Sequence, residues 1–349
     1  MNDAAFDLLK PELDTASGNA LWIADENALR PAQLTAANQA VAVISNRFDL
    51  CQRLKSNGWN CSFSDFDLSV YPDRSVDRIY YRISKEKPVV HHIINEALRC
   101  LKVDGELYIT GLKNEGIKTY LTKAKGLFDG QIELSKSDKN TWMGLLKRPS
   151  TAGSEPLDDQ DYCQLREVAS DERFSYISKP GVYGWNKIDK GSEYLISELD
   201  QFIAEMAKPP ERILDLGCGY GYLSLNCQQL NAEITATDNN AAAIAICKEN
   251  FKRNDVSGKV IAADCAADID QKFPMVICNP PFHQGFSIDG DLTEHFLQAT
   301  RRKLEPNGIA CFVVNLHIPL ERKAKKLFTT VRTIADNGSF RLVMLARPK

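Results

Sequence analysis

The chain has 349 residues, enough for about two domains of ordinary size. Its 43 basic and 46 acidic residues leave a formal charge of −3, so nucleic-acid contact requires a local basic patch. No run approaches the roughly 18 apolar residues of a membrane span, and the acidic first residues lack the basic and apolar regions of a signal peptide. Ten cysteines stand singly, without C-x-x-C pairs. We therefore predict no metal site and a cytoplasmic location with reduced thiols.

Strand and helix patterns alternate along both halves of the chain. Short apolar runs predict strands at residues 41–45, 78–81 and 106–110 in the first half, and at 212–216, 233–238, 259–264, 275–280 and 309–314 in the second. Strands that alternate with helices form parallel βαβ units, so we predict an α/β fold. The segment Arg148–Pro156 combines Pro, Gly, Ser and Thr without apolar periodicity, which is typical of a linker. We therefore expect two domains, residues 1–150 and 157–349.

The two halves resemble each other around one helix and the strand that follows it. The segment His92–Gly105 has a gapless counterpart in His295–Gly308, which lies 203 residues later. Each segment predicts an amphipathic helix, a turn whose glycine caps the helix C-terminus, and a strand. Many α/β proteins contain such a unit, but the gapless spacing favours a duplication.

A glycine-rich loop in the second half separates a predicted strand from a predicted helix. The loop contains Gly217, Gly219 and Gly221, which lack a Cβ and so let the backbone turn sharply and approach a ligand. The helix offers free N–H groups at its start. The glycines fall as GxGxG, unlike the GxGxxG of dinucleotide-binding loops. Asp215, just before the loop, suits a positively charged or donor group, which favours a cofactor with an amino-acid tail. A tight turn without a ligand is the alternative.

Acidic residues also end the next two predicted strands. Asp238 lies about 20 residues past the glycine loop, where an acidic residue can accept both ribose hydroxyls of a nucleoside. Its alternative role is to cap the helix that follows. Asp264 ends the third strand and is placed to accept from an adenine amino group. Its alternative is a loop residue that faces solvent.

The tetrad Asn279-Pro280-Pro281-Phe282 follows the fourth strand and is the most informative motif in the chain. Two prolines make the turn rigid and remove two N–H donors. The Asn279 amide and the Pro280 carbonyl would then act as acceptors for a planar amino group. Phe282 offers an apolar face on which a base stacks. A plain turn with an aromatic residue in the core is the alternative, but the order of the motifs favours a site.

These motifs together resemble class I S-adenosylmethionine-dependent methyltransferases that carry an (Asn/Asp/Ser)-Pro-Pro-(Tyr/Phe) motif. The chain is more specifically similar to the RsmC family of 16S rRNA guanine-N2 methyltransferases. The matching residues are Pro180–Tyr183, Asp189–Ser192, the glycine loop and Cys278–His283. The similarity covers about residues 176–349 and extends faintly to residues 80–88 and 111–116. Tyr183-Gly184 stands where this family usually has Phe-Ser, and Cys278 stands where it more often has Ser.

The resemblance implies two tandem class I methyltransferase domains, each a mostly parallel sheet flanked by helices. The first domain is expected to be degenerate, because residues 21–29 (LWIADENAL) replace the glycine loop and residues 80–85 (YYRISK) replace the Asn-Pro-Pro-Phe tetrad. That domain would bind substrate or serve as a scaffold. The second domain would bind S-adenosylmethionine and catalyse methyl transfer.

The implied reaction transfers a methyl group to N2 of a guanine in 16S rRNA. Asn279 and the Pro280 carbonyl would hold the amino hydrogens and aim the nitrogen lone pair at the methyl group. A base in a helix cannot reach such a site, so the target must be unpaired or flipped. The expected catalytic residues are Asn279, Pro280 and Phe282. The expected cofactor-binding residues are Asp215, Gly217, Gly219, Gly221, Asp238, Asp264 and Asn279.

The expected partners are 16S rRNA and the 30S subunit, with no membrane and no metal. Candidate phosphate contacts are Arg301–Lys303 and Arg322–Lys326 in the second half, and Lys113, Lys118, Lys123 and Lys125 in the first. Charged runs are more often solvated helix faces. Two similar fused domains favour a monomer.

Three alternative functions follow from the same residues. One is methylation of guanine N2 in 23S rRNA, since a sister family has nearly identical motifs. Another is methylation of adenine N6 in nucleic acid, or of a protein glutamine amide. The third is a non-catalytic RNA-binding factor in ribosome assembly, against which the intact glycine loop and Asn279 argue.

Overall fold

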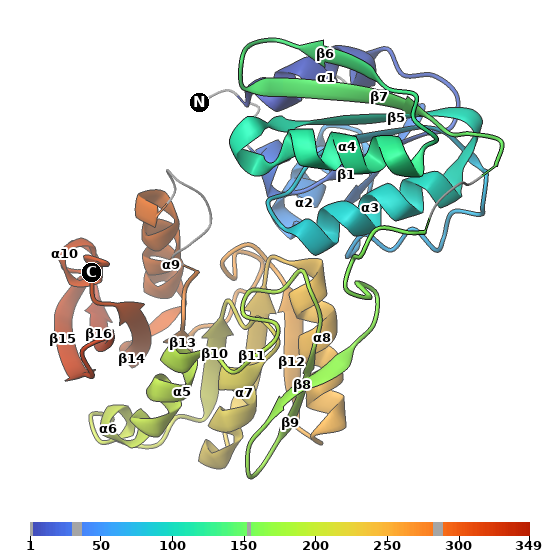
Figure 1. Ribbon diagram of the computed structural model, residues 1–349. Helices are drawn as coiled ribbons and strands as arrows, with labels where there is room; N and C mark the ends of the chain where they lie inside the picture. Colours follow the sequence, from blue (N-terminus) through green and yellow to red (C-terminus); the bar gives the residue numbers. More distant parts are fainter. Residues whose placement is uncertain (1–2, 30–36, 152–154, 282–288) are drawn as a thin grey trace. The chain divides into compact units, whose positions relative to one another are not determined.

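The computed structural model describes residues 3–29, 37–151, 155–281 and 289–349, and its contacts divide the chain into two compact units, residues 1–164 and 165–349. Each unit contains one seven-stranded, mostly parallel sheet with helices on both faces (Figure 1). The predicted α/β fold with two tandem domains is therefore confirmed. Unit 2 additionally begins with a two-stranded hairpin.

The sheet of unit 1 has the strand order β3-β2-β1-β4-β5-β7-β6, with β7 antiparallel to both of its neighbours. Its elements are α1 (Ala4–Asp14), β1 (Ala20–Ala24), the 3-10 helix η1 (Glu26–Leu29), β2 (Val41–Ser45), α2 (Phe48–Ser56), β3 (Asn60–Phe63), β4 (Val76–Arg82), α3 (Lys87–Cys100), β5 (Leu101–Leu112), η2 (Lys113–Glu115), α4 (Ile117–Leu127), β6 (Glu133–Lys136) and β7 (Thr141–Lys147). Alternate residues of β1 face opposite cores: Trp22 packs with α1 and α2, whereas Leu21 and Ile23 pack with α3 and α4. The sheet is thus buried on both faces.

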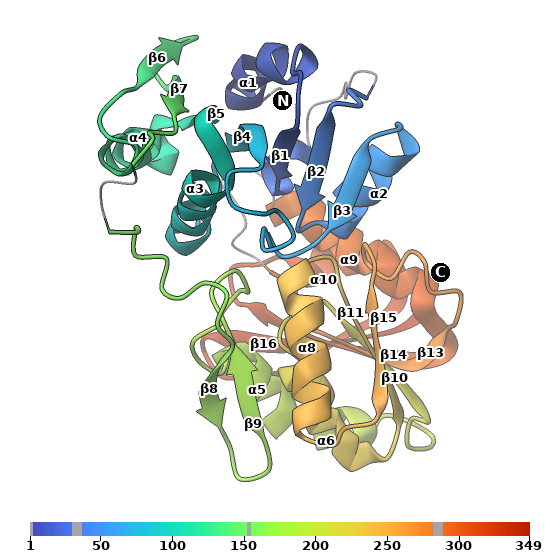
Figure 2. The ribbon, with the colours of Figure 1, turned by 90° about the vertical axis from the view of Figure 1, so that its right-hand side faces the viewer.

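The sheet of unit 2 has the order β12-β11-β10-β13-β14-β16-β15, which repeats the arrangement of unit 1 strand for strand. Its elements are β8 (Arg166–Ser170), β9 (Ser175–Ser178), α5 (Lys190–Ser197), α6 (Leu199–Ile203), β10 (Arg212–Leu216), α7 (Tyr222–Cys227), η3 (Gln228–Leu230), β11 (Glu233–Asp238), α8 (Ala241–Arg253), β12 (Gly258–Ala262), β13 (Phe273–Cys278), α9 (Asp289–Lys303), β14 (Leu304–Asn315), α10 (Leu320–Ala324), β15 (Phe328–Asp336) and β16 (Phe340–Pro348). The helices α5 to α8 pack on one face and α9 and α10 on the other. Figure 2 shows α8 running along its side of this sheet.

The duplication extends to a shared irregularity in the two sheets. β5 and β14 begin and end 203 residues apart. The register of β5 with β4 shifts between Leu101 and Glu106, and the register of β14 with β13 shifts at the equivalent place, between Leu304 and Ile309. A Cβ at Gly105 would lie 2.8 Å from the Lys102 carbonyl oxygen, and one at Gly308 would lie 2.7 Å from that of Pro274. Close backbone approach therefore requires both glycines.

The predicted role of these glycines as helix C-caps is wrong. The C-cap of α3 is Leu101, whose backbone is extended (φ −66°, ψ 141°), so the helix passes directly into β5. Gly105 has no positive φ; the left-handed residue of this turn is Asp104, with φ 62°. The pattern of helix, glycine and strand was correct, but the glycine serves the strand irregularity rather than the helix end.

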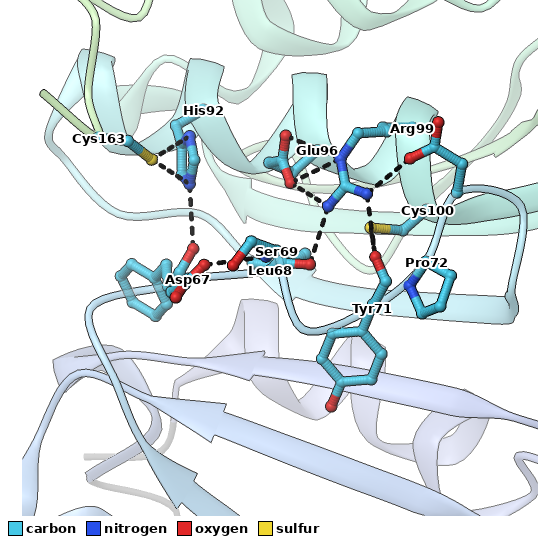
Figure 3. A network of polar contacts seen from close by, with 12 residues as sticks. Asp67, Leu68, Ser69, Tyr71, Pro72, His92, Glu96, Arg99, Cys100 and Cys163 are labelled. Carbon is cyan, nitrogen blue, oxygen red and sulfur yellow. Dashed lines mark hydrogen bonds and ion pairs between the residues drawn. The ribbon is translucent and has the colours of Figure 1, made fainter.

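Polar contacts tie the loop between β3 and β4 to α3 (Figure 3). The Arg99 guanidinium donates to the carbonyl oxygens of Leu68 (2.8 Å) and Tyr71 (2.9 Å), and His92 Nε2 lies 3.0 Å from that of Phe66. The same helix holds the segment that leads to unit 2. Asn95 exchanges two hydrogen bonds of 2.8 Å with the backbone of Leu157.

Further contacts explain where the compact units divide. The ring of Tyr162 stacks on His92 with centroids 4.6 Å apart, and its hydroxyl donates to Asp65 at 2.7 Å. Residues 157–163 therefore pack with unit 1, and the division falls after Gln164 rather than within the Pro- and Ser-containing segment at residues 148–156.

Candidate functional site

The candidate site lies in unit 2, at the sheet edge formed by the carboxyl ends of its parallel strands. The chain leaves β10 toward β11 and β12 on one side, whereas β13 and β14 lie on the other, so the strand order reverses between β10 and β13. Ligands of open α/β sheets bind at such a reversal. Asp215 pairs with Ile277 across these two strands. The glycine loop that follows Leu216 therefore emerges beside Asn279.

The glycine loop has the tight backbone that the sequence predicts. Gly217, Gly219 and Gly221 have φ values of 83°, 54° and 93°, in the left-handed region that favours glycine. The N–H groups of Gly217 and Cys218 both donate to the Thr237 carbonyl oxygen, at 2.9 and 3.0 Å, which fastens the loop to β11. A Cβ at Gly219 would meet open space, so the middle of the loop leaves room for a ligand.

Asp215 lies fully buried under this loop. Its Oδ2 accepts a 2.6 Å hydrogen bond from the equally buried hydroxyl of Ser224, the third residue of α7. Its Oδ1 is buried and has no partner among the described residues. Burial raises the pKa of Asp215 to about 7, and the nearby Asp238 carboxylate acts in the same direction. An unpaired carboxylate oxygen in this position suits a donor or a positively charged group.

Asp238 joins the loop to the end of β11. Its Oδ2 accepts from the Gly219 N–H (3.0 Å), and its Oδ1 accepts from the Asn240 N–H (2.8 Å). The alternative that Asp238 caps α8 is not what the structure shows, because Asn240 is the N-cap and accepts from Ala242 and Ala243. Asp238 therefore does not cap α8 and remains a candidate to accept hydrogen bonds from ribose hydroxyls.

Asp264 follows β12 at the same edge and is half-buried. Its neighbour Cys265 has a pKa raised to about 12 by burial and by the Asp264 carboxylate. Because Asp264 follows β12, it lies at the same sheet edge as Asp238, and its contact with adenine stays a prediction.

Asn279 follows β13 and is held by two side chains of the segment that begins α5. Its Nδ2 donates to Asp189 Oδ1 at 2.7 Å and to the Ser192 hydroxyl at 2.8 Å. Both amide hydrogens are therefore used, and Oδ1 accepts no hydrogen bond from a described residue. The geometry thus leaves an acceptor, and not a donor, at the end of β13.

The rest of the tetrad is described only in part. Pro280 is buried and Pro281 is half-buried. Phe282 and His283 lie outside the described residues. In the ranges that the structure covers, no group of three or more His, Cys, Asp or Glu is placed to hold a metal ion, and no described helix is long and apolar enough to cross a membrane.

The corresponding edge of unit 1 carries other residues. Ala20 pairs with Val41 as Arg212 pairs with Glu233, so Asp25 stands at the level of Gly217, and Asn46 at that of Asp238. The glycine loop is replaced by η1, and the Asn27 side chain donates to the carbonyl oxygen of Ile83 at 3.2 Å.

A buried ion-pair network fills the same edge of unit 1. The Arg82 side chain, 4% exposed, donates to Glu115 at 2.6 and 3.0 Å and to Asp3 at 3.0 Å. It also donates to the carbonyl oxygen of Ile83 at 2.7 Å. These side chains satisfy one another, whereas unit 2 presents a glycine loop and an amide oxygen that accepts from no described residue.

Comparison with known proteins assigns both units. Residues 173–344 match the family model "Methyltransferase small domain", and residues 8–139 match "Methyltransferase small domain N-terminal". The chain belongs to the methyltransferase small domain family. The resemblance to methyltransferases that the sequence motifs indicated is confirmed, and the chain is a methyltransferase.

Curated relatives match this small-domain methyltransferase along most of its length. "Ribosomal RNA small subunit methyltransferase C" of Shewanella loihica is 27% identical over 328 residues, which are 93% of each chain. The protein of the same name from Haemophilus influenzae strain PittGG is 26% identical over 292 residues, 81% of this chain and 85% of the relative.

A solved structure shows the same fold across both units. It is described as "T. Thermophilus 16S rRNA N2 G1207 methyltransferase (RsmC) in complex with AdoMet and Guanosine". The TM-score is 0.84 at 20% identity, with 99% of this chain and 92% of that chain covered.

The structure adds site residues to which the sequence assigned no role. Asp189 and Ser192 belong to the motif that carries the family resemblance, but only the folded chain brings them to Asn279, some 90 residues later. Ser224 was part of an apolar helix start and holds Asp215. An Asp such as Asp189 before a helical pattern is an N-cap signal and could have indicated the cap, though not the contact with Asn279.

The basic residues that are candidates for phosphate contacts differ in their exposure. The Lys303 ammonium is buried and donates to the Ile269 carbonyl oxygen, and Arg301 donates to the backbone of Lys349 at 2.7 Å. Arg322, Lys325 and Lys326 are exposed. Lys113, Lys118 and Lys125 of unit 1 are exposed as well, whereas Lys123 is half-buried with its ammonium 3.2 Å from His91 Nε2.

Proposed function

We propose that this chain transfers a methyl group from S-adenosylmethionine to the exocyclic N2 of a guanine in 16S rRNA. The relative that matches along 93% of its length is named for the small-subunit RNA, and the structure with the same fold contains AdoMet and guanosine. The single observation that carries the proposal is the acceptor geometry at Asn279. Its amide nitrogen is used within the protein, and its oxygen is left beside the glycine loop.

The residues at the edge of unit 2 fit the cofactor. Asp215 has a buried carboxylate oxygen with no partner among the described residues, which suits the cofactor's amino group. Gly219 leaves open space where a side chain would stand, so the backbone can approach the ligand. Asp238 is free of the helix cap and suits the ribose hydroxyls. Gly217, Gly221, Asp264 and Asn279 complete the expected binding set.

The protein's contribution to the reaction is positioning and electrostatics. When bound, the cofactor supplies a methyl group on a sulfonium that is already activated. Asn279 Oδ1 and the carbonyl of Pro280 accept from the guanine amino group, which fixes the nitrogen and stabilises the positive charge that develops on it. Phe282 supports the base by stacking. No side chain has to remove a proton before methyl transfer, because the proton can leave afterwards.

We propose that unit 1 binds substrate or serves as a scaffold, because its own sheet edge is filled by the Arg82 network. The proposed substrate is 16S rRNA, free or within the 30S subunit, and the proposed location is the cytoplasm. Two fused units of the same fold are consistent with a chain that acts as a monomer.

The substrate is tested by incubating the protein and isotope-labelled cofactor with naked 16S rRNA, 30S subunits, 50S subunits and DNA, followed by nucleoside analysis. The expected product is N2-methylguanosine in 16S rRNA, either free or in 30S subunits. Label in 50S subunits would favour the 23S rRNA alternative, and N6-methyladenosine in DNA or RNA would favour the adenine alternative. Absence of cofactor binding in calorimetry would favour the non-catalytic assembly factor.

A further inference from the structure

Asn279 is held by a carboxylate that also begins a helix. Asp189 is the N-cap of α5, and its Oδ1 accepts from the Ser192 N–H at 2.9 Å. The same oxygen accepts from Asn279 Nδ2 at 2.7 Å. The hydroxyl of Ser192, a residue that is 7% exposed, accepts a hydrogen bond of 2.8 Å from the second amide hydrogen of Asn279. The start of α5 therefore places two acceptors on one side of the Asn279 amide.

Such an arrangement decides which way the amide faces. An amide has donor and acceptor ends of nearly the same shape, so shape alone does not fix its orientation. A carboxylate has no hydrogen to donate, so turning Asn279 by 180° would set two oxygens against each other at 2.7 Å. The turned form would also place a donor where the guanine amino group needs an acceptor.

Packing around Gly191 keeps the carboxylate in place. A Cβ at Gly191 would lie 3.1 Å from Asp189 Oδ1 and 3.1 Å from the Phe340 ring, tighter than ordinary contact. Gly191 has no positive φ, so an alanine there would act through this contact and not through backbone strain. Asp189 Oδ1, which holds Asn279, thus accepts from the Ser192 N–H and lies close to Gly191.

We propose that Asp189, assisted by Ser192, is the positioning residue that locks the Asn279 carboxamide with Oδ1 toward the guanine amino group. This inference rests on the proposed function, because the guanine amino group toward which Asn279 is oriented belongs to the proposed substrate. The lock itself is a property of the protein without substrate, which allows the two to be tested separately.

Two variants of Asp189 separate the lock from the helix cap. Asp189→Ser keeps a good N-cap but is too short to reach Asn279. Asp189→Asn keeps both the cap and an oxygen at the Oδ1 position. We expect Asp189→Ser to lower kcat by roughly 10- to 100-fold, the loss typical of a misplaced reacting group, with the KM for cofactor within about two-fold of wild type. Asp189→Asn should restore most of the rate, and Gly191→Ala should fall between the two.

The lock is read directly from the side-chain amide signals of Asn279 in protein labelled with ¹⁵N-asparagine, assigned by their loss in Asn279→Ala. Hydrogens bonded to a carboxylate and a buried hydroxyl should exchange slowly with water in the wild type. They should exchange at least about ten-fold faster in Asp189→Ser/Ser192→Ala, with thermal unfolding as the control for folding. Equal exchange in both proteins would overturn the lock.

The kinetic result decides whether the lock serves catalysis. A kcat for Asp189→Ser equal to that of Asp189→Asn would overturn the positioning role, even if the amide signals change. If wild-type protein methylates no RNA, the proposed function fails, while the exchange measurement still decides whether Asp189 holds Asn279.

Discussion

Arg82 occupies the position in the first sheet that Asn279 occupies in the second. Tyr81 pairs with Ile109, the ninth residue of β5, and Cys278 pairs with Phe312, the ninth residue of β14. The next residue is Arg82 in one unit and Asn279 in the other. The same strand end therefore holds a buried ion pair in one copy and, in the other, an amide oxygen that accepts from no described residue.

The Arg82 network gives a prediction about the stability of unit 1. Arg82→Ala leaves the buried Glu115 carboxylate without its partner, so the free energy of unfolding should fall by about 3–5 kcal/mol. Arg78→Ala is the matched control. Its pair with Glu106 is about one third exposed, and its loss should cost less than about 1 kcal/mol. Denaturant titration measures both, and equal losses would refute the difference.

Asp215 gives a prediction about pH. Its folded pKa of about 7 lies above the value near 3.8 of an exposed carboxyl, so its favourable contribution is present below about pH 4 and is lost as pH rises through 7. Asp215→Asn keeps an acceptor for Ser224 and removes this titration. The stability of the variant relative to wild type should therefore increase between pH 5 and pH 7 and then level off. A constant difference across that range would show that Asp215 does not titrate there.

The paired glycines give a prediction about packing. Gly308→Ala and Gly105→Ala would each press a Cβ against a backbone oxygen that cannot move away, and should destabilise the protein by about 1–3 kcal/mol. Gly126→Ala in α4 meets nothing within 4 Å and should be neutral or stabilising by up to about 1 kcal/mol. The thermal midpoints of the three variants test this order.

The exposed lysines give a prediction about RNA binding. Lys325→Ala/Lys326→Ala should weaken binding and reduce the slope of log affinity against log salt by about 2, since each phosphate contact contributes roughly 1. Lys303→Met should leave the slope unchanged, because that ammonium is buried against Ile269. An unchanged slope in the double variant would remove Lys325 and Lys326 from the RNA interface.

The sequence predicted some strands to the residue and missed others. Strands 41–45, 212–216 and 233–238 agree with the structure to the residue, and each is mostly buried. In the two seven-stranded sheets, the strands that were not predicted are β1, β3, β6, β7, β15 and β16, although β1 is fully buried at the centre of its sheet. β6 is exposed throughout and β15 mixes exposed and half-buried residues, so neither carries a clear pattern.

The site shows a similar division between local and distant information. The glycine loop and the strand ends at Asp215 and Asp238 were identified because their chemistry lies next to a strand in the sequence. The contact between Asp189 and Asn279 depends on how α5 packs at the sheet edge, which no local pattern specifies. The helix-cap role of Gly105 was predicted incorrectly, since a glycine after a helix also suits a strand irregularity.

The central claim is that the Asn279 carboxamide oxygen holds the guanine amino group during methyl transfer. Its most direct test compares wild type and Asn279→Ala for single-turnover methylation of the RNA that the wild type modifies, together with calorimetric binding of the cofactor. We expect a rate loss of about 100-fold or more with a cofactor Kd within about three-fold of wild type. A variant that methylates at nearly the wild-type rate would contradict it.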